Sequence, residues 1–139
     1  MFSYICLGTN NLPRAIAFYD ATLAPLGLQR CTTPGEENWT DWAGWGTHKA
    51  EGAQELALWV CKPFDGLAPS VGNGCMVALK AASWAAVRAF HTAALMHGGS
   101  SAGEPGLRPQ YNDDFYAAYV RDPDGNKLAA VCRGFTTDQ

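Results

Sequence analysis

An internal repeat constrains the fold of this chain more than any other feature of its sequence. The segments 17–23 (AFYDATL) and 89–95 (AFHTAAL) are identical at four of their seven positions and lie 72 residues apart. The same offset places Gly27 on Gly99, the apolar segment 4–7 on 76–79, and the segment 56–60 on 128–132. Because such repeats indicate duplicated structural units, we expect two copies of one module, at about 1–65 and 70–133. We expect the two modules to form a single domain, 1–133, followed by a C-terminal tail, 134–139.

Each copy carries signals for one strand, one helix and three further strands. Apolar first strands are expected at 2–8 and 75–80. The helices follow Asn11 and Ser83, which are residue types that cap helix N-termini, and glycines end them at 27 and 98–99. Strand signals bounded by turns then lie near 28–33, 39–46 and 54–61, and near 101–103, 115–121 and 127–133. The predicted fold class is therefore α+β, with the order βαβββ repeated twice.

Composition and charge exclude several classes of function. The chain has 139 residues, of which 47% are hydrophobic and 17% charged, with a formal net charge of −3. A nucleic-acid-binding domain normally carries a basic stripe, so we expect no nucleic-acid partner. We also expect no membrane association, because no apolar run is long enough to span a bilayer and the N-terminus lacks the basic region of a signal peptide. Five scattered cysteines without a CxxC motif indicate reduced thiols and a cytoplasmic location.

Side chains alternate between the two faces of the predicted strands. Leu56, Leu58 and Val60 share one face, and the strands at 2–8, 75–80 and 127–133 show the same aliphatic alternation. We expect this aliphatic face to pack under the helices. The opposite face carries tyrosine, methionine and tryptophan beside small residues. That mixture suits the wall of a cavity or, alternatively, a second packed face.

Two motifs resemble those of the vicinal oxygen chelate superfamily, which contains glyoxalase I, bleomycin-resistance and fosfomycin-resistance proteins, and extradiol dioxygenases. The segment 12–19 (LPRAIAFY) is similar to the first helix of these proteins, and the segment 119–126 (YVRDPDGN) to their closing hairpin. The resemblance covers about residues 1–133. It implies an open, curled mixed sheet around a pocket with the helices outside, and a homodimer. Because this fold hosts many functions, the motifs do not identify the reaction.

The resemblance also implies where a divalent metal ion would be held. Family members use histidine and carboxylate side chains on the first and last strands of the modules. These positions correspond here to Tyr4, Met76, Ala57 and Ala129. The repeat offset pairs Tyr4 with Met76 and Ala57 with Ala129. Hard divalent ions prefer carboxylate oxygen or imidazole nitrogen, and none of the four side chains offers either. We therefore expect no metal site and no cofactor.

Other polar residues do not form a recognisable catalytic group, and no catalytic residue is assigned. His91 and His97 lie six residues apart on one predicted helix, about 240° around its axis, so they do not converge. Cys6 has no neighbouring base or positive charge in the sequence that would activate it. The remaining candidates are expected in loops or at strand ends: His48, Glu55, Asp113 and Asp114.

Aromatic side chains point to a ligand-binding function more clearly than the polar residues point to a catalytic one. They gather in two regions: Trp39, Trp42, Trp45 and Trp59 in the first copy, and Tyr111, Phe115, Tyr116 and Tyr119 in the second. Aromatic rings provide contact area and cation–π capacity, and ligand pockets combine an apolar wall with a few polar groups. The predicted ligand pocket is lined by Tyr4, Cys6, Trp42, Ala57, Trp59, Met76, Arg108, Tyr116 and Ala129.

Three functions remain open. The first is a glyoxalase/bleomycin-resistance-like protein that binds a small aromatic or cationic organic molecule without metal. The second is a lyase or isomerase of the glyoxalase type with a rebuilt or metal-independent site, in which Tyr4 or Tyr116 acts as general acid. The third is a non-catalytic dimeric structural module whose pocket has filled in. Saturable binding, turnover and the absence of a cavity distinguish the three.

Overall fold

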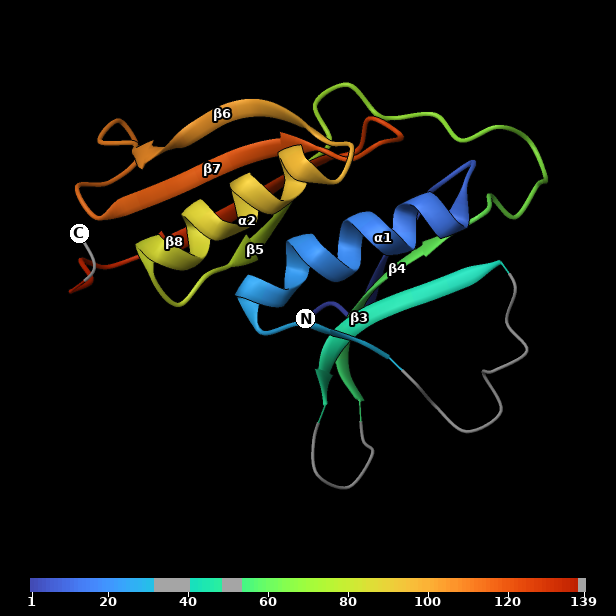
Figure 1. Ribbon diagram of the computed structural model, residues 1–139, viewed down its shortest axis with the longest axis horizontal. Helices are drawn as coiled ribbons and strands as arrows, with labels where there is room; N and C mark the ends of the chain where they lie inside the picture. Colours follow the sequence, from blue (N-terminus) through green and yellow to red (C-terminus); the bar gives the residue numbers. More distant parts are fainter. Residues whose placement is uncertain (32–40, 49–53, 138–139) are drawn as a thin grey trace.

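Two consecutive modules of the same architecture make up the chain. The computed structural model describes residues 1–31, 41–48 and 54–137. The first module contains β1 (Tyr4–Gly8), α1 (Leu12–Leu23), η1 (Ala24–Leu26), β2 (Gln29–Arg30), β3 (Trp42–His48) and β4 (Gln54–Cys61). The second contains β5 (Val77–Lys80), α2 (Trp84–Met96), β6 (Ser100–Leu107), β7 (Phe115–Arg121) and β8 (Lys127–Arg133). This order confirms the duplicated βαβββ pattern (Figure 1).

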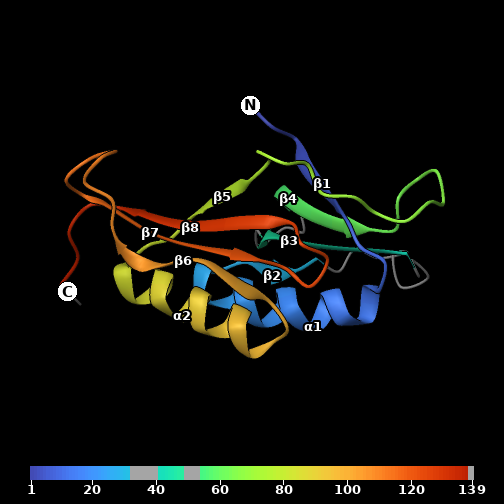
Figure 2. The same ribbon diagram turned by 90° about the horizontal axis from the view of Figure 1, so that it is seen from above.

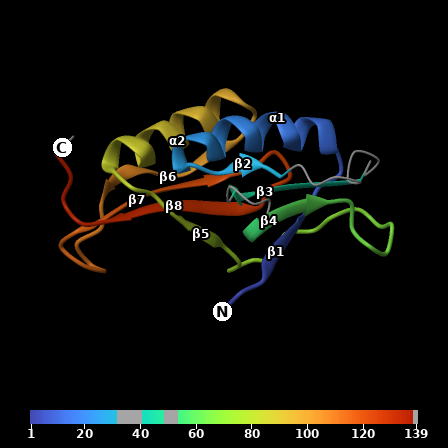
Figure 3. The ribbon, with the colours of Figure 1, turned by 90° about the horizontal axis from the view of Figure 1, so that it is seen from below.

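The strands form two four-stranded mixed sheets with the orders β1-β4-β3-β2 and β5-β8-β7-β6. In each sheet the first strand runs parallel to the last strand of its module, and the other pairs are antiparallel. Both helices lie on the same side of the sheets, as Figure 2 and Figure 3 show, and α1 packs against α2. The fold class is α+β as predicted. The open mixed sheet expected from the resemblance consists of two four-stranded parts, one from each module, and no described strand of one pairs with a strand of the other.

The helices begin at the predicted caps. The side chain of Asn11 accepts a hydrogen bond from the backbone N of Arg14 at 3.1 Å, and Ser83 accepts one from Ala86 N at 3.0 Å. Each bond satisfies a backbone N–H that lacks a partner within the helix. Gly27, with φ of 76°, ends the helical turn η1 in the left-handed region. Within the described residues, neither helix is long and apolar enough to cross a membrane.

The core lies between the helices and one face of each sheet. Leu58 and Val60 of β4 and Leu128 and Ala130 of β8 are buried there, as the strand alternation predicts. Trp45 of β3 also lies on this face: its ring is buried, and its Nε1 donates to Asp20 Oδ1 at 2.9 Å. The other face of both sheets, called the open face below, carries no helix (Figure 3).

The repeat does not keep one offset throughout, which corrects the sequence prediction. Thr9 N donates to Cys61 O at 2.9 Å, and Ala81 N makes the equivalent bond to Val131 O at 2.8 Å. The first strands are therefore related by 72 residues and the last strands by 70. A slip of two residues keeps every side chain on the same face, so the apolar pattern matches equally well in both alignments.

The closing hairpin joins the two modules. The side chain of Asp124, in the turn between β7 and β8, accepts hydrogen bonds from Thr9 Oγ1 at 2.5 Å, Asn10 N at 3.0 Å and Arg14 Nη2 at 3.0 Å. The amide Nδ2 of Asn126 donates to Gly8 O at 3.0 Å. These contacts fix the N-terminal end of α1 against the second module, and Asp122, Asp124 and Asn126 together form an intermodule clamp.

Tyr19 links α1 to the same clamp and makes stability depend on alkaline pH. Its hydroxyl donates to Asp122 Oδ2 at 2.6 Å. Burial, reinforced by the charge of Asp122 and the hydrogen bond to it, raises the pKa of Tyr19 well above its ordinary value of 10.0. Above pH 10 the unfolded chain loses this proton while the folded chain keeps it, so the free energy of unfolding falls as pH rises.

We therefore expect wild-type protein to lose up to about 1.4 kcal/mol of stability per pH unit above pH 10 through this group. In Tyr19→Phe the loss of stability caused by Tyr19 ionisation should disappear. The variant should nevertheless be less stable than wild type at pH 8, because it lacks the hydrogen bond to Asp122. Urea denaturation of both proteins between pH 8 and pH 11 measures the difference. Parallel pH profiles for the two proteins would show that Tyr19 ionises equally in both states.

Candidate ligand-binding site

The open face of the second sheet contains a hollow of about 520 Å³. Its volume lies within the range of small-molecule sites, about 300–1,000 Å³. The lining residues come from β6, β7, the start of β8, the loop after β6 and the segment before β5: Met76, Ala102, Gly103, Arg108, Gln110, Tyr111, Phe115, Tyr119 and Lys127. Two of them, Met76 and Arg108, belong to the pocket predicted from the sequence.

The Tyr119 ring forms the floor of this hollow. Tyr119 lies on β7 opposite Gly103 of β6. A Cβ atom placed on Gly103 would lie 2.8 Å from the ring, closer than real side chains approach. Glycine at this position therefore allows the Tyr119 ring to lie against the neighbouring strand, where any larger residue would collide with it.

Two positive side chains flank the Tyr119 ring. The Arg108 guanidinium carbon and the Lys127 Nζ each lie 5.5 Å from the ring centroid, within the range of a cation–π contact. Arg108 Nη2 also donates to Glu104 O at 2.5 Å, which holds the guanidinium in place. The lining residues include no acidic residue. The hollow therefore carries two positive charges without a carboxylate among its described walls.

Further positive charge lies beside the hollow. Arg121 of β7 stands directly opposite Lys127 of β8 in the antiparallel register. Like charges in opposed positions destabilise a strand pair. Arg121 Nη1 donates to Gly125 O at 2.9 Å, and no carboxylate of the described residues lies within ion-pair distance of either side chain. A bound anion would reduce this repulsion.

The outer rim of the hollow is aromatic and electrically balanced. The rings of Tyr111 and Phe115 meet edge to face with centroids 5.3 Å apart, and Tyr111 is 65% exposed. Arg133 lies over the Phe115 ring at 5.7 Å and forms an ion pair with Asp114 at 3.1 Å. The uncompensated charge is thus concentrated at Tyr119, and the rim contributes apolar contact area.

The first sheet brings together the other predicted pocket residues. Tyr4 pairs with Ala57, and Cys6 with Trp59, so these four side chains share the open face. Trp42 lies on the same face, because it pairs with Cys61, two residues beyond Trp59. The Trp59 ring covers Gly44, where a Cβ atom would lie 2.5 Å from the ring. These residues line a different sheet from Met76, Arg108 and Ala129, so the predicted pocket divides into two groups.

Tyr116 lies on the other face of the second sheet, which corrects its assignment to the pocket. It is buried beneath α2, where its ring stacks on Trp84 with centroids 4.3 Å apart. Tyr116 pairs with Cys132 and alternates with Phe115 and Ala117 along β7. Alternation along β7 puts Tyr116 on one face of the sheet and Phe115 and Tyr119 on the other. The sequence prediction grouped these residues by their proximity along the chain and did not apply this alternation.

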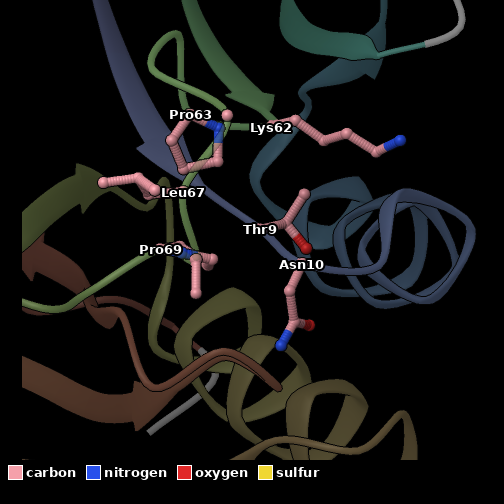
Figure 4. Close-up of a pocket in the computed structure, with 8 residues that line it drawn as sticks. Thr9, Asn10, Lys62, Pro63, Leu67 and Pro69 are labelled. Carbon is pink, nitrogen blue, oxygen red and sulfur yellow. The ribbon is translucent and has the colours of Figure 1, made fainter.

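A smaller hollow of about 220 Å³ lies where β1 leads into α1 (Figure 4). Its polar groups already have partners: Thr9 Oγ1 donates to Asp124, and Lys62 Nζ lies 3.2 Å from Asp41 Oδ1. In Figure 4 the Lys62 side chain extends away from Pro63 and Leu67. This hollow therefore offers an apolar wall without an available charged group, and we do not assign a ligand to it.

The residues expected at the metal positions do not fit a divalent ion. Tyr4 is 62% exposed, Met76 is 45% exposed, and Ala57 and Ala129 are buried alanines. By strand register the counterpart of Ala129 in the first module is Trp59, since Cys6 pairs with Trp59 and Ala78 with Ala129. In the described part of the chain no three His, Cys, Asp or Glu residues are grouped to hold a metal ion.

Three of the other polar candidates, His91, His97 and Asp114, have structural partners. His91 is buried against β6, with Nε2 2.9 Å from Ser101 Oγ, and His97 Nδ1 lies 2.8 Å from Ala93 O. The two histidines do not meet, as predicted. Trp39 and the side chains of His48 and Glu55 lie outside the described residues.

Lys127 is the site residue that the sequence analysis missed. It follows the Asp122–Gly125 turn, and its side chain lies on the open face with Ala129. Counting the alternation of β8 backwards from Ala129 would have placed it there, because positions 127 and 129 share a face. Tyr111, Phe115 and Tyr119 were noted as an aromatic group but were not included in the predicted pocket.

The structure is similar to several solved structures. A glyoxalase/bleomycin resistance protein from Albidiferax ferrireducens T118 is 32% identical with a TM-score of 0.79, over 96% of this chain and 99% of that chain. A glyoxalase-related enzyme from Fulvimarina pelagi is 16% identical with a TM-score of 0.70, over 96% and 88%. Glyoxalase I from Zea mays is 22% identical with a TM-score of 0.59, over 94% of this chain and 45% of the plant chain. No family model and no curated protein matches the sequence.

Proposed function

Because the chain belongs to the glyoxalase/bleomycin-resistance family of the vicinal oxygen chelate superfamily, we propose that it binds a small aromatic anion in the hollow on its second sheet, without a metal ion. The observation that carries this proposal is the pairing of an aromatic floor with two cations and no acid in the described lining. The floor is Tyr119, and the cations are Arg108 and Lys127.

The positive charges of Arg108 and Lys127 favour an anionic ligand over the cationic ligand that the sequence analysis also allowed. A ligand cation would compete with Arg108 and Lys127 for the Tyr119 ring and would be repelled by both. An aromatic carboxylate would place its ring against the exposed aromatic surface and its charge between the two cations. Hydrogen bonds between charged groups contribute about 1.5–3 kcal/mol each, so two of them are enough for specific recognition of a small molecule.

The glyoxalase-type lyase or isomerase remains the alternative, and no observation favours it over binding. The family positions for metal ligands hold Tyr4, Met76, Ala57 and Ala129, which do not supply the donors such an ion prefers. The cysteines are thiols and form no disulfide within the described residues, which supports a reducing compartment such as the cytoplasm.

The proposal is tested with probes of equal size and different charge. Chelator-treated protein is titrated with benzoate, benzyl alcohol and benzylamine, and binding is followed by NMR. We expect saturable binding of benzoate at a dissociation constant below about 1 mM, or about 4 kcal/mol, and weaker binding of the other two. Equal or tighter binding of benzylamine would contradict the anion preference. A requirement for added Ni²⁺, Zn²⁺, Mn²⁺, Co²⁺ or Fe²⁺ would favour the enzyme alternative.

Single substitutions in the hollow should weaken benzoate binding. Lys127→Gln and Arg108→Gln each remove one charged contact, and we expect each to raise the dissociation constant about tenfold, equivalent to about 1.4 kcal/mol. The control is Lys62→Gln, because Lys62 already pairs with Asp41 away from the second sheet. An equal effect of all three variants would show that binding follows net charge rather than this site.

We further propose that the protein is a homodimer whose second copy covers the open face of the second sheet and closes the hollow. Apolar side chains on or beside this face are exposed in the single chain, among them Met76 at 45% and Tyr111 at 65%. Contiguous exposed apolar patches commonly mark protein interfaces. Sedimentation velocity should give a mass near twice 14.9 kDa; a monomer at all concentrations would rule the dimer out.

A further inference from the structure

Two thiols lie together on the open face of the first sheet. Cys6 is in β1 and Cys61 is the last residue of β4, and their Sγ atoms are 3.2 Å apart. β1 and β4 run parallel, with Cys6 opposite Trp59, so Cys61 is the next residue along β4 on the same face. Neither cysteine takes part in the ligand hollow proposed above, which lies on the second sheet.

We propose that Cys6 and Cys61 are a reversible oxidation site, which a hydroperoxide converts from a dithiol to an intrachain disulfide. The S–S bond of a disulfide is about 2.05 Å long, so the two sulfur atoms must approach by about 1.2 Å. β1 is an edge strand, with β4 as its only neighbour among the described strands of the sheet, and the Cys6 side chain is exposed. Both features allow Cys6 to make the movement without disturbing the core.

The different surroundings of the two thiols assign their roles. Cys6 is exposed and accessible to a reagent in solution, whereas Cys61 is 5% exposed. Burial, together with the hydrogen bond and charge of Cys6, raises the pKa of Cys61 to about 12, so Cys61 remains a thiol at neutral pH. Because the thiolate is the attacking form, Cys6 is the sulfur that meets the oxidant.

The reaction balances with one hydroperoxide per chain. The Cys6 thiolate attacks the terminal peroxide oxygen, the O–O bond breaks, and Cys6 sulfenic acid and an alcohol (water for hydrogen peroxide) are formed. The Cys61 thiol then transfers its proton to the sulfenic oxygen as its sulfur attacks Cys6 sulfur, so the S–O bond breaks, the S–S bond forms and water leaves. Two sulfur atoms have lost two electrons in total, and the peroxide has gained them. An added thiol reverses the reaction by exchange.

The full-length protein is treated with hydrogen peroxide, free thiols are alkylated, and digested peptides are identified by mass spectrometry. We expect a linked peptide pair that contains Cys6 and Cys61, and a decrease in titratable thiols from the five of the sequence by two per chain. Dithiothreitol should restore all of them. Cys6 sulfinic acid beside an intact Cys61 thiol, or a link from either residue to another cysteine, would overturn the proposal.

Two variants separate this pair from general thiol oxidation. Cys6→Ser changes an exposed side chain, so the protein should fold, and it should leave Cys61 reduced after the same treatment. Cys75→Ser removes the other exposed cysteine and should still lose two thiols per chain. Equal oxidation of Cys61 in wild type and Cys6→Ser would show that Cys6 is not required. Benzoate binding is measured separately on the reduced protein, so either proposal can fail alone.

Discussion

Replacing Asp122 by alanine is expected to lower the free energy of unfolding by about 3–5 kcal/mol, as breaking a buried polar network typically does. The Asp122 side chain is 4% exposed and accepts hydrogen bonds from Tyr19 OH at 2.6 Å, Asp124 N at 3.0 Å and Asn126 N at 2.8 Å. A fourth bond comes from Asn126 Nδ2 at 2.9 Å. Alanine would leave these donors without an acceptor, and a buried unsatisfied group costs about 1–3 kcal/mol.

Urea denaturation at pH 7 measures this loss, and Asp114→Ala is the matched control. Asp114 is also an aspartate on the second module, but it forms a partly exposed ion pair with Arg133. Exposed pairs contribute about 0–1 kcal/mol, so the control should change stability little. Similar losses of unfolding free energy in the two variants would show that the hydrogen bonds of Asp122 contribute no more to stability than an exposed ion pair.

Phe18→Ala is the second substitution with a large expected effect, about 3–5 kcal/mol, which is the usual range for deleting a buried phenylalanine ring. Phe18 of α1 is fully buried, and its ring meets Tyr19 edge to face at 4.9 Å. It also reaches the second module, since a Cβ atom on Gly99 would lie 2.7 Å from the Phe18 ring. The cavity would therefore open where the two modules meet.

Thermal and urea unfolding of Phe18→Ala are compared with those of Phe64→Ala. Phe64 is fully exposed in the segment between the modules, so its removal should change stability by less than about 0.5 kcal/mol. Phe18→Leu keeps most of the volume and should lose clearly less than Phe18→Ala. A small effect of Phe18→Ala would mean that the modules adjust and close the cavity.

Most helices and strands of the fold could be predicted from short sequence patterns. Asn11 and Ser83 are caps because their short side chains satisfy a nearby backbone N–H, which is a local property. The faces of β4 and β8 follow from a period of two, which also depends only on neighbours in sequence. The registers between strands cannot be predicted from this alternation, because a slip of two residues leaves every side chain on the same face. For this reason the sequence indicated an offset of 72 residues between the last strands of the modules, whereas the structure has 70.

The candidate site was predictable only in part, because it depends on register and on distance across the sheet. Met76 and Arg108, two residues of the predicted pocket, line the hollow on the second sheet. Lys127 was missed because its contact with Tyr119 depends on the register between the neighbouring strands β7 and β8. Tyr4, Cys6, Trp42, Ala57 and Trp59 share the expected face, but that face belongs to the other sheet. No signal in the sequence states how the two sheets are placed relative to one another.

The intermodule clamp couples the two copies of the duplicated chain. Asp124 holds residues at the start of α1, and Asn126 holds the end of β1, so the last hairpin of the second module completes the first. Neither half retains all its buried hydrogen bonds after the other has melted. The two copies should therefore lose structure in one cooperative transition, and a single half expressed alone would lack the partner groups that finish it.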